Sequence, residues 1–259
     1  MDGVSGLTEY QREHQDAARI ATEAGEALLV LRRELDGGID PKEIRDRGDR
    51  SSHDLIVRLL GELYPDDAVL SEEAKDNPVR LERSRVWIVD PLDGTREFGE
   101  PGRTDWAVHV ALAVDEVPVV GAVALPGRGM TLATDPAPSL AAEAGVPPRI
   151  VVSRTRPPAV ALQVADALSG QLVEMGSAGA KAMAVVLGEV DIYVHAGGQY
   201  EWDSAAPVAV AASAGLHVSR IDGSPIRYNQ PNPWLPDLLI CRQEFAPSVL
   251  AVLAAASDS

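Results

Sequence analysis

The chain has 259 residues, of which 46% are hydrophobic and 24% charged, as in soluble globular proteins with one large domain or two lobes. Its net charge of −16 excludes a nucleic-acid polymer as the expected partner, because such a chain offers no basic surface to neutralise a phosphate backbone. The single cysteine, Cys241, excludes an internal disulfide. With no leader-like segment and no apolar run of membrane-spanning length, we expect a cytoplasmic protein without a membrane partner.

Two amphipathic helices are predicted at the start of the chain. Thr8 begins a capping-box pattern ahead of the first helix, and Gly37-Gly38 ends that helix. Residues 40–50 are polar and are predicted to form a loop. They lead to a second helix, whose apolar face lies between residues 55 and 63.

Strands are predicted next, at residues 68–70, 86–89, 106–114 and 117–125. The run at 86–89 is apolar throughout and is typical of a fully buried strand. The run at 106–114 alternates larger with smaller residues and is typical of a half-buried one.

A segment rich in Pro, Gly and Ala follows, from residue 126 to 148. We place a lobe boundary there, between an N-terminal α+β lobe at 1–145 and a C-terminal α/β lobe at 146–259. Strands and helices alternate beyond the boundary, which favours an α/β arrangement. The expected strands are 150–153, 172–175, 191–195, 216–220 and 238–241, and the expected helices are 157–169, 178–187 and one that starts at Asp203.

The segment after the strand at 86–89 carries the most informative chemistry. Asp90, Pro91, Leu92, Asp93 and Gly94-Thr95 follow one another directly. Two carboxylates held by a stiff proline turn form a site for a hard divalent cation, and free N–H groups at Gly94-Thr95 favour a phosphate. Asp, Pro and Gly are also ordinary turn residues, so the segment alone does not decide between a site and a turn.

Two further acidic segments favour a site. Ser71-Glu72-Glu73 places acids after the predicted strand at 68–70. Asp203 stands at the start of an alanine-rich helix, where an Asp also serves as a cap. The three segments together indicate divalent-cation and phosphate chemistry.

On these residues the chain resembles the inositol monophosphatase superfamily of magnesium-dependent, lithium-inhibited phosphomonoesterases. The resemblance rests on Glu72-Glu73, on residues 90–95 and on residues 202–205, and it covers most of the chain. Within the superfamily, the chain is most similar to the CysQ-type 3′(2′),5′-bisphosphate nucleotidases. The resemblance implies a layered α/β/α/β/α sandwich of two lobes and a homodimer.

The resemblance also implies two Mg²⁺ ions and a weaker third. Glu72, Asp90 and the backbone carbonyl of Leu92 would hold the first ion. Asp90 would bridge to the second, which Asp93 and Asp203 would complete. Oxygen ligands of this kind suit Mg²⁺ and argue against zinc.

A threonine that is hydrogen-bonded to an upstream aspartate orients the attacking water in the family. Thr95 matches the threonine, and Glu72 is the further catalytic candidate. Asp49 is the expected partner of Thr95, but the sequence around it departs from the family's Val-Thr-x-x-Asp pattern, which leaves Asp46 as a rival. The plain alternative for Asp49 is a solvated loop acid or a helix cap. Glu73 would lie beside the third ion.

Substrate contacts are implied at both phosphates. Gly94 and Thr95 would hold the phosphate that is cleaved, with Asp203 beside the substrate. The candidates for the rest of the substrate are Ser153, Arg154, Ser177, Lys181 and Tyr200, with Tyr228 as a second candidate for stacking on adenine. Lys181 is either a phosphate ligand or a lysine that snorkels to solvent.

The expected reaction is hydrolysis of the 3′-phosphate of 3′-phosphoadenosine 5′-phosphate, or of its sulfated form, in sulfur assimilation. Inositol monophosphate and fructose 1,6-bisphosphate are alternative substrates. A catalytically silent binding module is the alternative from another class, and the presence of every expected acid and of Thr95 argues against it.

Overall fold

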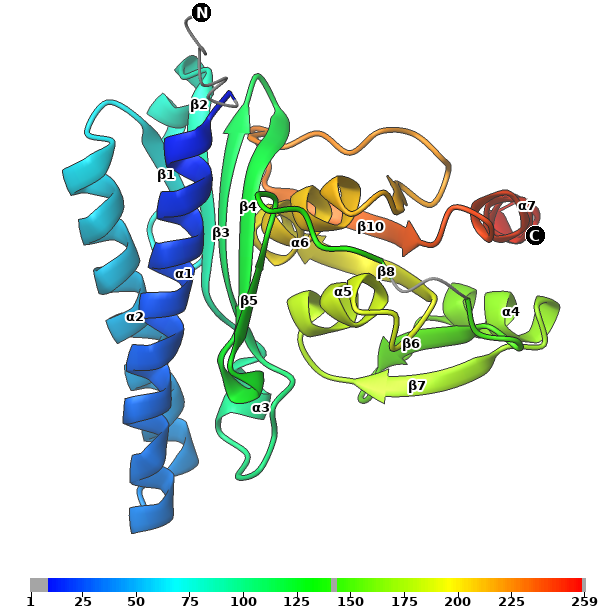
Figure 1. The fold of residues 1–259 in the computed structure, drawn as a ribbon, viewed down its shortest axis with the longest axis horizontal. Coiled ribbons are helices and arrows are strands. Elements are labelled where there is room, and N and C mark those ends of the chain that lie inside the picture. The colour runs from blue at the N-terminus through cyan, green and yellow to red at the C-terminus, as the bar shows by residue number, and fades with distance from the viewer. Residues whose placement is uncertain (1–8, 141–143, 258–259) are drawn as a thin grey trace, which may run out of the picture.

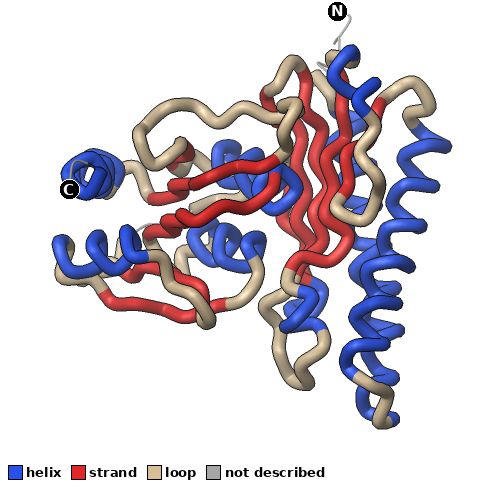
Figure 2. Tube along the Cα trace, turned by 180° about the vertical axis from the view of Figure 1, so that it is seen from behind, coloured by secondary structure: helices blue, strands red, loops and turns tan. Residues whose placement is uncertain are grey.

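Helices and sheets alternate in this protein as five layers. The computed structural model describes residues 9–140 and 144–257, so the predicted cap at Thr8 lies outside the described residues. Two five-stranded sheets have the strand orders β1-β2-β3-β4-β5 and β7-β6-β8-β10-β9. Figure 2 shows the strands of the two sheets running in different directions.

The elements have the following bounds. The first sheet contains β1 (Ala68–Ser71), β2 (Arg85–Asp93), β3 (Ala107–Val114), β4 (Val117–Leu125) and β5 (Met130–Ala133). The second contains β6 (Arg149–Ser153), β7 (Gln171–Met175), β8 (Ile192–Tyr200), β9 (His217–Ser219) and β10 (Trp234–Cys241). The α-helices are α1 (Gln11–Arg32), α2 (Pro41–Leu63), α3 (Thr95–Phe98), α4 (Ala159–Ala167), α5 (Ala178–Val186), α6 (Glu201–Ser213) and α7 (Ala246–Ser257), and short 3₁₀ turns are η1 (Arg33–Gly37), η2 (Pro78–Glu82) and η3 (Pro126–Arg128).

Helices α1 and α2 cover the outer face of the first sheet (Figure 1). Helices α5 and α6 lie between the sheets, where α6 contacts β2, β3 and β4 on one side and β8, β9 and β10 on the other. Helices α4 and α7 pack on the far face of the second sheet. The layer order α/β/α/β/α confirms the predicted sandwich. Among the described residues, no helix is both long and apolar enough to cross a bilayer.

Burial on both faces explains the apolar run in β2. Trp87 and Val89 pack under α1 and α2, while Val86 and Ile88 face the layer of α5 and α6. The expectation of a half-buried strand at 106–114 was wrong, because β3 is buried on both faces. Its smaller side chains are the ones that face α5 and α6, and their size lets those helices approach the sheet closely.

A glycine sets the closest approach of α6 to the first sheet. A Cβ on Gly121 of β4 would lie 2.7 Å from the Ala209 Cβ and 2.8 Å from the Ala206 carbonyl oxygen, both on α6. Only a residue without a side chain fits this contact. The contact matters for the site, because α6 carries Asp203 and the first sheet carries the other acids.

The second helix begins earlier than predicted. Asp40 caps it by accepting a hydrogen bond from the Lys42 N–H, and Pro41 occupies the first turn. The expected loop at 40–50 is therefore helical. The polar composition misled the prediction because only Ile44 and Gly48 of residues 41–50 are buried.

Two other elements were not predicted, the edge strand β5 and the C-terminal helix α7. Four-residue β5 lies inside the Pro- and Gly-rich segment, where composition favours a loop. Helix α6 begins at Glu201, so Asp203 is its third residue. The proposed boundary at residue 145 falls between the last strand of the first sheet and the first strand of the second, and the division into lobes stays a prediction.

Candidate metal and phosphate site

The acidic segments meet at one edge of the first sheet. Strand β1 runs parallel to β2 with Ser71 paired to Val89, so Glu72 leaves β1 beside Asp90 of β2. The β2–β3 register shifts between Asp90 and Asp93, which lets both aspartates project from the same strand end. Parallel pairing thus joins two segments that are distant in sequence.

Asp90, Asp93 and Asp203 form a cluster in which one oxygen from each carboxylate lies within 4.8 Å of the others. The first two come from β2 and the third from α6. Asp90 and Asp93 are buried. A set of carboxylate oxygens fits a hard divalent cation and lacks the nitrogen or sulfur donors typical of zinc sites.

Burial, and then the crowding of negative charge, raises the pKa values of most of these acids. Burial, then Glu72 and Asp93, raise the pKa of Asp90 well above its usual range. Burial and the Asp203 carboxylate raise the pKa of Glu72 to about 7, and burial and Asp93 raise the pKa of Asp203 to about 6. Acids that resist ionisation because they face one another are stabilised by a cation placed among them.

Asp93 is the exception among the acids. Burial acts to raise its pKa, but the contacts with His109, Ser177 and Gly179 outweigh burial and lower the pKa to about 2. Ser177 Oγ donates a 2.5 Å hydrogen bond to Asp93 Oδ2, and the N–H groups of Gly179 and Ala178 donate at 2.6 and 3.1 Å. Ser177 is the N-cap of α5, so the start of this helix holds Asp93 as an anion.

The segment after Asp93 turns sharply. Gly94 adopts φ 83°, a left-handed conformation that favours glycine, and a Cβ there would lie 2.9 Å from the Ser177 Cβ. Thr95 then begins α3. The Thr95 hydroxyl donates to the Leu92 carbonyl at 2.9 Å and lies 3.3 Å from Asp49 Oδ1. The structure therefore brings together Thr95, Asp49 and the carbonyl that the sequence placed in the metal site.

Of the two candidate partners of Thr95, only Asp49 reaches it. Asp49 lies on α2, and burial followed by the Glu73 charge raises its pKa to about 7. Asp46 is exposed and forms an ion pair with Lys42 at 3.0 Å. The plain alternative of a solvated loop acid or a helix cap does not describe Asp49, because it lies inside α2, whose N-cap is Asp40.

Helix α2 is locked against the acidic turn by small residues. A Cβ on Gly48 would lie 2.9 Å from the Phe98 ring and 3.0 Å from Leu92. The Ser52 hydroxyl donates a 2.7 Å hydrogen bond to the Pro91 carbonyl. Sequence reasoning missed both residues, because their spacing of four is a signal only once residue 48 is known to be helical.

The residues assigned to the substrate differ in burial. Lys181 is buried, its Nζ donates to the Ser177 carbonyl at 2.6 Å, and burial lowers its pKa, so the snorkelling alternative was wrong. Tyr200 is 45% exposed and stacks on Trp202 with ring centroids 4.7 Å apart. Tyr228 is fully buried and cannot stack on a ligand.

The remaining two substrate candidates form contacts of their own. Arg154 donates to Glu97 Oε1 and Glu100 Oε1, each at 2.6 Å. The Ser153 hydroxyl accepts hydrogen bonds from the backbone N–H groups of Thr155 and Arg156. Arg154 therefore contacts both α3 and the loop that follows it, and Ser153 stabilises a turn.

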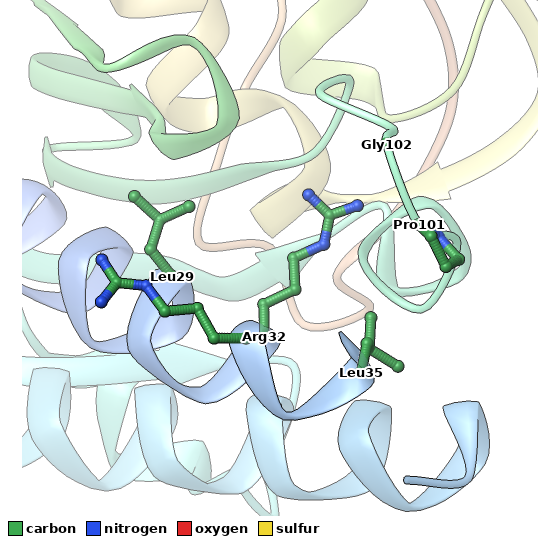
Figure 3. Close-up of a pocket in the computed structure, with 6 residues that line it drawn as sticks. Leu29, Arg32, Leu35, Pro101 and Gly102 are labelled. Atoms are coloured by element: carbon green, nitrogen blue, oxygen red, sulfur yellow. The ribbon is translucent and has the colours of Figure 1, made fainter. Parts of the chain in front are cut away.

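Arg32 of α1 holds the loop after α3 in place. Arg32 donates hydrogen bonds to the carbonyls of Phe98, Glu100 and Arg103 at 2.9, 2.6 and 2.6 Å. A cavity of about 260 Å³ lies beside this contact, between α1 and the Pro101-Gly102 loop (Figure 3). Its walls include none of the clustered acids, so it is distinct from the metal site.

Comparison with known proteins identifies the class to which this fold and site correspond. The sequence model of the inositol monophosphatase family matches residues 10–257, and the chain belongs to that family. The family is metal-dependent, and the acidic cluster is a site that can hold a metal ion. Among solved structures, inositol monophosphatase II of Staphylococcus aureus has a TM-score of 0.76 at 19% identity, covering 92% of this chain and 94% of that one.

Relatives with higher identity carry more specific names. The 3′-phosphoadenosine 5′-phosphate phosphatase of Mycobacterium tuberculosis is 55% identical over 240 residues, 90% of each chain. The protein of the same name from Mycobacterium leprae is 51% identical over 260 residues, covering 95% of this chain and 96% of that one. The crystal structure of CysQ from Bacteroides thetaiotaomicron has a TM-score of 0.76 at 27% identity and covers 90% of this chain and 98% of that one.

Proposed function

We propose that this protein is a Mg²⁺-dependent phosphatase that removes the 3′-phosphate of 3′-phosphoadenosine 5′-phosphate, or of its sulfated form, in sulfur assimilation. The observation that carries the proposal is the cluster of Asp90, Asp93 and Asp203, assembled from two segments of a chain that is 55% identical to a phosphatase named for this substrate. We further propose that it is a cytoplasmic, lithium-sensitive homodimer.

The clustered acids would serve as ligands to two metal ions. Glu72, Asp90 and the Leu92 carbonyl would hold one, and Asp90, Asp93 and Asp203 the other; Glu73 would serve a weaker third. A bound divalent cation supplies Lewis-acid stabilisation of the phosphate and lowers the pKa of a water molecule. The raised pKa values of Glu72, Asp90 and Asp203 support this assignment, since they report carboxylates that lack a counter-charge.

Asp49 and Thr95 would orient the attacking water and accept its proton. Their oxygens lie 3.3 Å apart, and the pKa of Asp49, about 7, suits an acceptor that works near neutral pH. The N–H groups of Gly94 and Thr95 would bind the phosphate that is cleaved, because the left-handed turn at Gly94 leads directly into α3.

Lys181 would bind the phosphate that remains on the nucleotide. Its Nζ makes hydrogen bonds to backbone carbonyls of Ser177 at 2.6 Å and Gly176 at 3.4 Å, and an ammonium has three protons to donate. Adenine would stack on the exposed ring of Tyr200, whose other contact is the stacked ring of Trp202. Ser153, Arg154 and Ser177 would complete this subsite, with Arg154 exchanging its contacts to Glu97 and Glu100 for the substrate.

Phosphate release from three compounds in parallel tests the proposal. Purified protein with Mg²⁺ is supplied with 3′-phosphoadenosine 5′-phosphate, inositol 1-phosphate or fructose 1,6-bisphosphate, each with and without Li⁺. We expect kcat/KM for the nucleotide to exceed the others by about a hundredfold or more, which is about 2.7 kcal/mol of transition-state discrimination. Comparable rates would indicate a broad sugar-phosphate phosphatase, and no release from any compound would indicate a silent binding module.

A further inference from the structure

One buried histidine lies within the acidic site. His109 is on β3, paired with Asp90 of β2 and fully buried. It belongs to the face of β3 that packs against α5 and α6, where its neighbours along the strand, Ala107 and Ala111, are small. An imidazole among alanines at this position is unusual for a packing residue, since a Val or Leu would fill the same space without a polar cost.

The His109 ring spans the two elements that supply the clustered aspartates. Its Nδ1 lies 3.0 Å from the Trp202 carbonyl oxygen on α6, directly before Asp203. Its Nε2 lies 3.2 Å from Asp93 Oδ2 on β2, at ion-pair distance but without the alignment of a hydrogen bond. A carbonyl oxygen only accepts, so Nδ1 donates to Trp202, and the Nε2 side of the ring faces the Asp93 carboxylate.

We propose that His109 is a positioning residue for the metal ligands Asp93 and Asp203, acting as a link between β2 and the first turn of α6. The inference rests on the metal site proposed above. On one side, His109 joins Ser177 Oγ and the Gly179 N–H around Asp93 Oδ2. Asp93 Oδ1, which accepts from the Ala178 N–H at 3.1 Å, would then be the oxygen available to a cation. On the other side, the contact with the Trp202 carbonyl fixes the backbone next to Asp203.

A glycine in α5 makes room for this link. A Cβ on Gly179 would lie 2.0 Å from His109 Nε2 and 3.1 Å from Asp93 Oδ2. Alanine stabilises a helix by about 1 kcal/mol relative to glycine. Because α5 is otherwise rich in alanine, Gly179 makes this helix less stable than an alanine would. The steric conflict gives the reason: an alanine at 179 would displace the imidazole from Asp93.

Metal binding by the full-length protein, measured without substrate, tests the link. Mn²⁺ or Mg²⁺ is titrated by calorimetry into metal-free wild type, His109→Ala, His109→Asn and His109→Gln, with circular dichroism to verify folding. We expect His109→Ala to weaken metal binding by about 10- to 100-fold, the usual effect of removing a group that orients a metal ligand. Gln places an N–H where Nε2 was and should recover more affinity than Asn, whose N–H replaces Nδ1. If the alanine variant does not fold, the Gln and Asn variants carry the comparison.

A second pair of variants separates the link from general packing. Gly179→Ala should weaken metal binding in the wild type but have a much smaller effect when combined with His109→Ala, because the displaced ring is then gone. His217→Ala, in β9 and bonded to Ser219, is the matched control and should bind metal as the wild type does. Equal affinity of wild type and His109→Ala would overturn the inference alone, whereas a wild type that binds neither ion would overturn the proposed metal site with it.

Discussion

The apparent affinity for Mg²⁺ should fall steeply as the pH is lowered from about 8 to about 5. A carboxyl group must lose its proton to bind a metal, so every acid with a raised pKa makes protons compete with the ion. Glu72 has a pKa of about 7 and Asp203 of about 6, both raised by burial and by neighbouring carboxylates. Asp93, with a pKa of about 2, stays ionised throughout and contributes nothing to the change.

The two raised values set the size of the effect. At pH 5, only about one in 100 Glu72 side chains and about one in 10 Asp203 side chains is ionised. The apparent affinity for Mg²⁺ should therefore be lower by about 100-fold from Glu72 and about 10-fold from Asp203, or about a thousandfold together. The sign follows from the direction of the shifts: affinity is complete above the raised pKa values and is lost as the pH falls through about 7 and then about 6. Asp90, also raised, acts in the same direction.

Calorimetric titration of Mg²⁺ at intervals across this range measures the dissociation constant directly. Repeating each titration in two buffers with different ionisation enthalpies counts the protons released on binding. Glu72 and Asp203 together should increase this number by about two between pH 8 and pH 5. The Asp203→Asn variant should also lower the pKa of Glu72, because Asp203 is the carboxylate that raises it most. A dissociation constant that changes by less than about tenfold between pH 8 and 5 would refute the reasoning that burial and crowding keep these acids protonated.

Four further outcomes follow from the geometry. Asp93→Asn should abolish turnover while circular dichroism shows an intact fold; substantial residual activity would contradict its role as a ligand. Lys181→Ala should raise KM for the bisphosphate nucleotide much more than for inositol 1-phosphate, and equal increases would argue against a second phosphate subsite. Asp49→Asn should lower kcat about a hundredfold or more, as expected for removal of a proton acceptor, whereas the exposed Asp46→Asn should retain it; equal effects would reverse the assignment. Gly121→Ala should lower the free energy of unfolding by about 1–3 kcal/mol in urea titrations, because its Cβ would overlap α6; an unchanged midpoint would mean that α6 can shift at no cost.

The acidic residues of the site could be recognised in the sequence because their pattern is local. Asp90, Asp93, Gly94 and Thr95 lie on one strand end and its turn. Both the strand and the turn have short-range sequence signals: an apolar run, a stiff proline and a glycine. The five-layer sandwich came from the resemblance of these motifs rather than from periodicity. Periodicity placed most strands and helices but overlooked β5 and α7.

Contacts between distant segments were not accessible in the same way. The polar composition of residues 41–50 concealed the first turns of α2, and with them the burial of Asp49 against Thr95. The sequence left Lys181 open between a phosphate ligand and a lysine that snorkels to solvent, because its sequence neighbours do not reveal the carbonyl that accepts a hydrogen bond from its ammonium. His109 gave no signal, since one polar residue in an apolar strand is compatible with many environments.

The sequence by itself determined which groups this protein carries: three acidic segments, a Gly-Thr turn after one of them, and the motifs of the family to which it belongs. The tertiary structure decided which of those groups face one another and in which state of charge. Parallel pairing of β1 with β2 and the close packing of α6 at Gly121 bring the acids together. The start of α5 lowers the pKa of Asp93, while burial and neighbouring carboxylates raise the pKa values of Glu72, Asp90 and Asp203. The physical reason is that pKa values and metal-binding geometry depend on distances of a few ångströms between side chains, and those distances arise only when the layers pack.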